Sequence, residues 1–146
     1  MSAPHLAARV PRAEWIAAMV LLSAVVSPEA LADEPATGLS ASLTCEAQSA
    51  PGRFRCDVEV RVADGELRWA DVQVVKTADF ILPLRGRLGP RDASSHERDI
   101  FRWSLGFVAK DRGTGEVTAR VHGVVCRGES CVPTTVDVTG RVAVGK

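Results

Sequence analysis

Apolar and polar residues alternate with a period of two along most of the chain after residue 38, which is the pattern of half-buried β-strands. The clearest run covers residues 54–62, where the apolar positions are Phe54, Cys56, Val58, Val60 and Val62. A second run, residues 101–107, carries the strongest aromatic face of the chain. A chain with this period buries one face of each strand, so the pattern predicts β-sheets with a shared core.

The turn residues between these runs predict how the strands connect. Ser49–Gly52 supplies turn chemistry for an antiparallel hairpin, and Asp64-Gly65 supplies the next turn. The strand expected over residues 66–76 changes phase near Ala70-Asp71, which indicates a bulge. Phe80, Leu82 and Leu84 are taken as the apolar phase of an edge strand, and residues 85–98 as the longest loop. Seven or eight short strands without an amphipathic helix predict an all-β fold, an immunoglobulin-like antiparallel β-sandwich.

The first 32 residues have the pattern of a cleavable signal peptide. Arg9 and Arg12 precede an apolar run over residues 15–26, which is too short for a permanent transmembrane helix. Ala30-Leu31-Ala32 then matches the small-x-small cleavage pattern. The alternative, a buried N-terminal helix, has no polar stripe to support it. We therefore expect residues 33–146 to form one exported domain, periplasmic or secreted, with no stable membrane insertion after cleavage.

Charge and motifs exclude several function classes. The 18 basic and 18 acidic residues balance, so no net field attracts nucleic acid. No G-x-S-x-G, H-E-x-x-H or phosphate-loop motif occurs. We expect no cofactor and no metal site: the loop segment His96–Asp99 is interpreted as solvated, as is His122 on its strand. Trp69 and Trp103 fit either a sugar-stacking surface or the core, and the fold favours the core.

Four cysteines in an exported chain predict disulfides, and four cysteines allow three pairings. The hairpin register places Cys45 opposite Cys56 on one apolar face, and a short loop joins Cys126 to Cys131. A zinc site is disfavoured because C-x10-C and C-x4-C differ from the usual C-x2-C spacing. We interpret Cys45–Cys56 as a structural staple.

The pair Cys126 and Cys131 has a different chemical character. Closing so short a loop removes little entropy from the unfolded chain, so a bridge there is easier to reduce than one that closes a long loop. A loop containing Gly128 also leaves at least one sulfur accessible to a thiolate. Arg127 and Glu129 flank the pair and act on a thiolate in opposite senses.

The segment 115–121, leading into Cys126–Pro133 and a valine-rich terminal strand, resembles the N-terminal periplasmic domain of the thiol:disulfide interchange protein DsbD. The resemblance implies an immunoglobulin-like fold and a redox-active pair, in which Cys131 forms the mixed disulfide and Cys126 resolves it. It implies thioredoxin-like periplasmic proteins and a membrane electron donor as partners. The family's aromatic residue before the first cysteine is absent, and Phe80 or Phe101 is the candidate for its shielding cap.

Two functions follow. The first is an exported thiol-disulfide exchange module, a possible thiol-disulfide oxidoreductase component, that passes reducing equivalents between a membrane partner and periplasmic proteins through Cys126–Cys131. Arg127, Glu129 and Pro133 would shape that site. The alternative is a noncatalytic immunoglobulin-like interaction domain with two structural disulfides.

Overall fold

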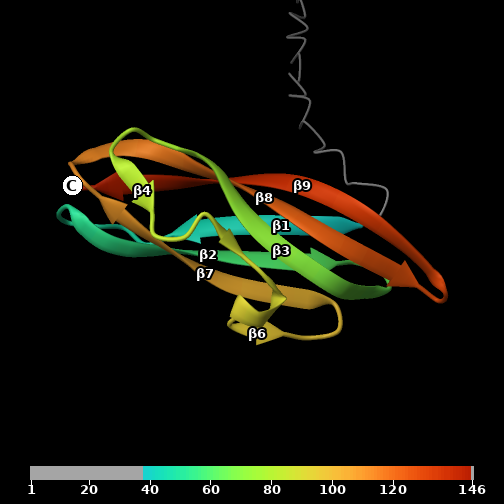
Figure 1. Ribbon diagram of the computed structural model, residues 1–146. Helices are drawn as coiled ribbons and strands as arrows, with labels where there is room; N and C mark the ends of the chain where they lie inside the picture. The colour runs from blue at the N-terminus through green and yellow to red at the C-terminus, as the bar shows by residue number, and fades with distance from the viewer. Residues whose placement is uncertain (1–37, 146) are drawn as a thin grey trace, which may run out of the picture. The chain divides into compact units, whose positions relative to one another are not determined.

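The computed structural model describes residues 38–145, which form two antiparallel β-sheets that enclose one core (Figure 1). The predicted signal peptide, residues 1–32, lies outside the described residues. The elements are β1 (Leu39–Cys45), β2 (Gly52–Val62), β3 (Glu66–Thr77), β4 (Ile81–Pro83), β5 (Arg87–Leu88), the 3-10 helix η1 (Pro90–Asp92), β6 (Ser95–His96), β7 (Ile100–Ala109), β8 (Gly113–Arg127) and β9 (Ser130–Val144). Within residues 38–145, no helix has the length and apolar character needed to cross a membrane.

The strand order identifies the fold. One sheet has the order β1-β2-β7-β4, with β6 also paired to β7, and the other has the order β5-β3-β8-β9. Immunoglobulin sandwiches have strands A-B-E-D in one sheet and C-F-G in the other. The order β1-β2-β7-β4 corresponds to A-B-E-D, and the order β3-β8-β9 corresponds to C-F-G. The two-residue strand β5 is an additional edge strand beside β3. The chain is therefore an immunoglobulin-like antiparallel β-sandwich, as predicted.

The segment 85–98 is not the loop that the sequence predicted. It contains β5, η1 and β6, which raises the described strands to nine. β5 pairs with β3, and β6 pairs with β7. Two-residue strands are too short for a period of two to be visible in the sequence, so the prediction missed them.

The core lies between the sheets and is built on the predicted aromatic face. Phe101, Trp103 and Phe107 are fully buried. The rings of Phe101 and Trp103 stack with centroids 5.3 Å apart, and Trp103 Nε1 donates a hydrogen bond to the Gly89 carbonyl at 2.9 Å. This bond satisfies the buried indole N–H and attaches the segment before η1 to the core.

The edge between β1 and β9 is closed by direct contacts. Gln48 N donates to the Ala143 carbonyl at 3.1 Å, and Gly145 N donates to the Gln48 carbonyl at 2.7 Å. At Gly140 a Cβ would lie 2.9 Å from Leu43 Cγ, so only glycine allows this approach of the two strands. β9 is thus covered by β1 along its C-terminal part.

Two predicted details of strand phase are wrong. β4 turns Ile81 inward and leaves Leu82 and Leu84 exposed, the opposite of the predicted phase. The register of β3 shifts between Leu67 and Trp69, earlier than predicted. Because the extra residue reverses the phase of the strand, Trp69 lies on the solvent side of the sheet and is 39% exposed.

Candidate functional site

Both predicted disulfides are present. Cys45–Cys56 joins register partners of β1 and β2, with Cα atoms 3.9 Å apart, and Cys126–Cys131 joins register partners of β8 and β9, with Cα atoms 4.0 Å apart. Each bridge therefore lies across one antiparallel hairpin, within one sheet. Neither links the two sheets of the sandwich.

The Cys126–Cys131 bridge lies at the tip of the β8–β9 hairpin, which extends past the end of β3 (Figure 1). Gly128 and Glu129 form its two-residue turn, and Gly128 has a φ of +60°. A left-handed glycine at the first turn position matches the twist of the two strands. Cys126 is 3% exposed, whereas Cys131 is exposed. Of the two sulfur-bearing residues, only Cys131 is open to an incoming thiolate.

Arg127 fixes the hairpin to the β2–β3 turn. Its Nε lies 3.2 Å from the Asp64 carbonyl oxygen and 3.4 Å from Asp64 Oδ2. At Gly65, which has a φ of +99°, a Cβ would lie 2.5 Å from the carbonyl oxygen of Cys126. The β2–β3 turn is therefore packed directly against the end of β8. Of the other two predicted site-shaping residues, Glu129 is exposed in the turn, and Pro133 is exposed on β9 opposite Val124.

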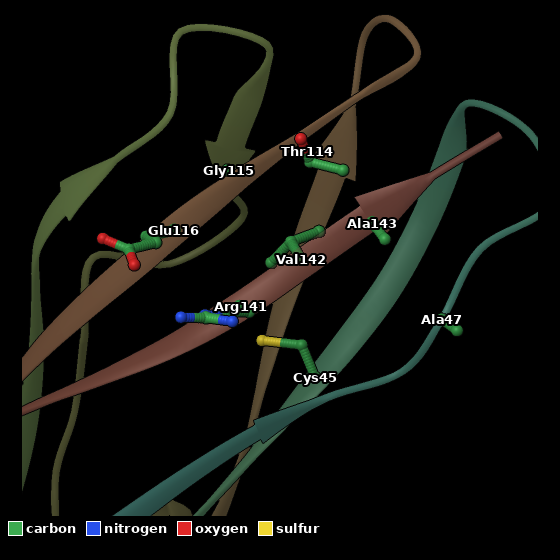
Figure 2. A pocket seen from close by; sticks show the side chains of 8 residues that line it. All are labelled: Cys45, Ala47, Thr114, Gly115, Glu116, Arg141, Val142 and Ala143. Atoms are coloured by element: carbon green, nitrogen blue, oxygen red, sulfur yellow. The ribbon is translucent and has the colours of Figure 1, made fainter. Parts of the chain in front are cut away.

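A groove of about 510 Å³ lies beside the other bridge (Figure 2). Figure 2 shows the Cys45 sulfur pointing toward Arg141, with Glu116 across the groove. Glu116 and Arg141 are register partners, but they form no ion pair with each other. Cys56 is fully buried in the core. The Cys45–Cys56 bridge is therefore also enclosed on one side and open on the other.

The solvent side of the β5-β3-β8-β9 sheet, here called the outer face, carries a row of apolar residues. Trp69, Val124 and Pro133 are register partners across β3, β8 and β9. Trp69 and Pro133 are exposed, and Val124 is half-buried. The next row toward the hairpin tip contains the Cys126–Cys131 bridge. The bulge in β3 thus brings an exposed tryptophan beside the open disulfide.

The row on the other side of Trp69 contains a charged cluster that the sequence did not reveal. Asp71 is only 1% exposed although it lies on the outer face. The Asp71 Oδ1 atom lies 2.9 Å from His122 Nδ1. The Asp71 Oδ2 atom accepts two hydrogen bonds from Arg87, one from Nε at 2.8 Å and one from Nη2. His122 lies on the solvent side of its strand, as predicted, and its side chain is 36% exposed; the contact of its ring with the buried Asp71 carboxylate was not predicted. The position of Asp71 between the apolar residues Ala70 and Val72 is the only sequence signal for this cluster.

Further along the outer face, Arg120 and Asp137 form a two-pronged ion pair. Arg120 Nε and Nη2 lie 2.8 Å and 2.9 Å from the two Asp137 oxygens. The Arg120 guanidinium holds the pKa of Asp137 below its ordinary value, and the carboxylate raises the pKa of Arg120. The Thr118 and Thr139 hydroxyls lie 3.0 Å apart in the next row. In these rows of the outer face, the Asp71 carboxylate contacts Arg87 and the Asp137 carboxylate contacts Arg120.

Neither aromatic candidate for a cap lies near Cys126. Phe101 is fully buried in the core. Phe80 packs near Gly115, which precedes Cys126 on β8 by about 36 Å of extended strand. His96 stacks on Phe101 with ring centroids 3.8 Å apart. Residues 38–145 contain no group of three or more His, Cys, Asp or Glu side chains placed to hold a metal ion.

Comparison with known proteins adds no family. No protein-family model matches the sequence, and no curated protein matches it either. The PapD-like domain 7 of human CEP192 is 11% identical, with 86% of this chain and 96% of that domain covered and a TM-score of 0.46. MyfA, the major subunit of Myf fimbriae from Yersinia enterocolitica, is 13% identical, with 74% and 98% covered and a TM-score of 0.36. The fold assignment rests on the strand order of the chain itself.

Proposed function

We propose that this chain is an exported, noncatalytic immunoglobulin-like binding domain whose two disulfides are structural. The observation that carries the proposal is Trp69, which is 39% exposed on the outer face, while the core is complete without it. Tryptophan is enriched in binding surfaces because it buries a large area at a low cost in side-chain entropy. The polar rows beside it supply the oriented hydrogen-bonding groups that specific binding needs.

The position of the disulfides supports this function. Each bridge joins two directly opposed residues of one hairpin, so each holds two strands that already pair. Cys56 is enclosed by the core, and Cys126 is nearly enclosed. Disulfides persist in oxidising compartments, which supports a periplasmic or secreted location.

Photo-crosslinking in the producing cells tests the binding face. A photoreactive residue placed at Thr135, on the outer face, is expected to give a light-dependent product with a protein or a polysaccharide. The same residue at Ser104, which is exposed on the opposite sheet, is the matched control and should give none. Trp69→Ala should suppress the product from Thr135. The absence of any product from Thr135 would refute a binding function for this face.

A second function, thiol-disulfide exchange, is supported by the exposure of Cys131 against the burial of Cys126. In the reduced domain, the Cys131 thiolate would attack a substrate disulfide, which forms a mixed disulfide and releases one substrate thiolate. The Cys126 thiolate would then attack Cys131 Sγ, which forms the Cys126–Cys131 bond and releases the second substrate thiolate. The substrate disulfide gains two electrons and the domain dithiol loses them, and the membrane electron donor would reduce the bridge again. The resemblance to the DsbD family suggests thioredoxin-like proteins and a membrane electron donor for this role. Native-state reduction of the bridge separates the two functions.

A further inference from the structure

We propose that the outer face binds an uncharged polysaccharide, with one pyranose ring stacked on Trp69 and the following rings hydrogen-bonded to His122, Arg120 and Asp137. This inference rests on the proposed binding function and names its ligand class.

Trp69 supplies the stacking platform. Its indole lies on the solvent side of a three-stranded surface, between an apolar row and a polar row. The C–H groups on one side of a pyranose ring form an apolar patch that packs on an aromatic face, while the hydroxyl groups at the ring edge need hydrogen-bond partners. A tryptophan bordered by polar side chains on one side meets both needs.

His122 is held ready to bond a hydroxyl group. Its Nδ1 is engaged by Asp71, a carboxylate that is 1% exposed, and this contact fixes the orientation of the ring. The side chain of His122 is 36% exposed. Its other ring nitrogen has no hydrogen-bond partner among residues 38–145. A buried group that orients an exposed one is a feature of binding sites with a defined ligand geometry.

The charge pattern of the outer face favours a neutral ligand over a charged one. Arg120 is paired with Asp137, and Arg87 and His122 both contact Asp71. Each of these guanidinium groups already contacts a carboxylate, so an anionic ligand or an acidic protein patch would have to compete with an existing ion pair. Paired carboxylate and guanidinium groups still have free hydrogen-bonding positions, which suit the hydroxyl groups of a sugar.

The spacing of the rows sets the size of the ligand. Adjacent strands are about 4.8 Å apart and alternate residues about 6.7 Å apart, so Trp69 lies about 8 Å from His122 and about 17 Å from Asp137. A single ring cannot contact all three residues. The outer face therefore fits an oligosaccharide or a polysaccharide chain that runs diagonally across β3, β8 and β9.

Affinity electrophoresis tests the proposal with defined probes. The exported protein is run through native gels that contain hydroxyethyl cellulose, barley β-glucan, galactomannan or dextran, with alginate as an anionic comparison. At least one neutral polysaccharide should retard the protein. Trp69→Ala should lower the affinity at least tenfold, Trp69→Phe should be intermediate, and His122→Ala should cost about three- to tenfold. Leu82→Ala, an exposed apolar residue of β4 outside the outer face, is the matched control and should leave retardation unchanged.

Retardation by alginate alone, no retardation by any neutral polysaccharide, or retardation that survives Trp69→Ala would each overturn the proposal. Circular dichroism of each variant shows whether the fold is retained. If the neutral gels fail while Thr135 still crosslinks to a protein, the binding function stands and the polysaccharide inference falls. If both fail, the binding function falls as well.

Discussion

Removing Cys45–Cys56 is predicted to destabilise the domain more than removing Cys126–Cys131. The two bridges close sequence separations of 11 and 5 residues. The loss of loop-closure entropy is then about 2.8 kcal/mol for the first bridge and about 2.1 kcal/mol for the second. Cys56 also belongs to the core cluster, so truncation to alanine adds about 1 kcal/mol for the cavity it leaves. We therefore expect the free energy of unfolding to decrease by about 4 kcal/mol when Cys45–Cys56 is removed and by about 2 kcal/mol when Cys126–Cys131 is removed.

Urea unfolding of the two double-alanine variants, C45A/C56A and C126A/C131A, measures this difference. Circular dichroism and tryptophan fluorescence should give coincident transitions, and the free energy of unfolding extrapolated to water should be lower for C45A/C56A. An equal decrease in the free energy of unfolding in the two variants, or a larger decrease in C126A/C131A, would refute the reasoning from loop length and core burial.

Three further predictions concern the outer face, a turn and the ion pairs. Arg87→Met should lower the free energy of unfolding by about 1 kcal/mol more than Asp71→Asn does in thermal unfolding. Arg87→Met leaves a buried carboxylate with one partner fewer, whereas Asp71→Asn leaves an arginine that water can solvate. The reverse order would contradict the assignment of Asp71 as a buried charge that depends on Arg87. Gly65→Ala should cost about 2–3 kcal/mol, because its φ of +99° and the nearby Cys126 carbonyl both oppose a Cβ, whereas Gly86→Ala, with open space around it, should cost less than about 1 kcal/mol in the same assay. Arg120 lowers the pKa of Asp137, and Arg102, followed by Arg61, lowers the pKa of Glu59. These contacts therefore stabilise the folded protein fully at pH values above the ordinary carboxyl pKa values of 3.8 and 4.5. Their contribution is lost as the pH falls through the lower pKa values of the folded state. The melting temperature should therefore decrease when the pH is lowered below about 4.5, and it should decrease less in Arg120→Gln than in the unmodified protein. An equal decrease in the two proteins would show that the Arg120–Asp137 pair contributes nothing measurable to stability.

Period-two alternation was sufficient to predict the long strands and both disulfides. The hairpin between residues 45 and 56 has a regular register, so the turn at Ser49–Gly52 places the two cysteines opposite each other. The alternation in β8 likewise placed His122 on the solvent side. Regular strands are predictable because burial of one face repeats every second residue.

Irregular positions were not predictable from a local pattern. Around residues 80–84 both alternate phases are largely apolar, so the sequence did not show that Ile81 faces inward. The bulge at Leu67/Trp69 moved Trp69 from the expected core to the outer face. The contact of Asp71 with His122 spans 51 residues and depends on the pairing of β3 with β8, which only the fold defines.

Reduction of the folded protein in glutathione buffers of graded potential shows whether the two disulfides of the proposed binding domain are structural. Thiol alkylation read by mass spectrometry reports Cys126–Cys131 and Cys45–Cys56 separately, and circular dichroism reports the fold. If both bridges are structural, they stay oxidised in the folded protein down to about −300 mV and are reduced only as the protein unfolds. Equilibration of Cys126–Cys131 well above about −300 mV, with the fold intact and Cys45–Cys56 oxidised, would contradict this prediction and establish an exchange-active disulfide.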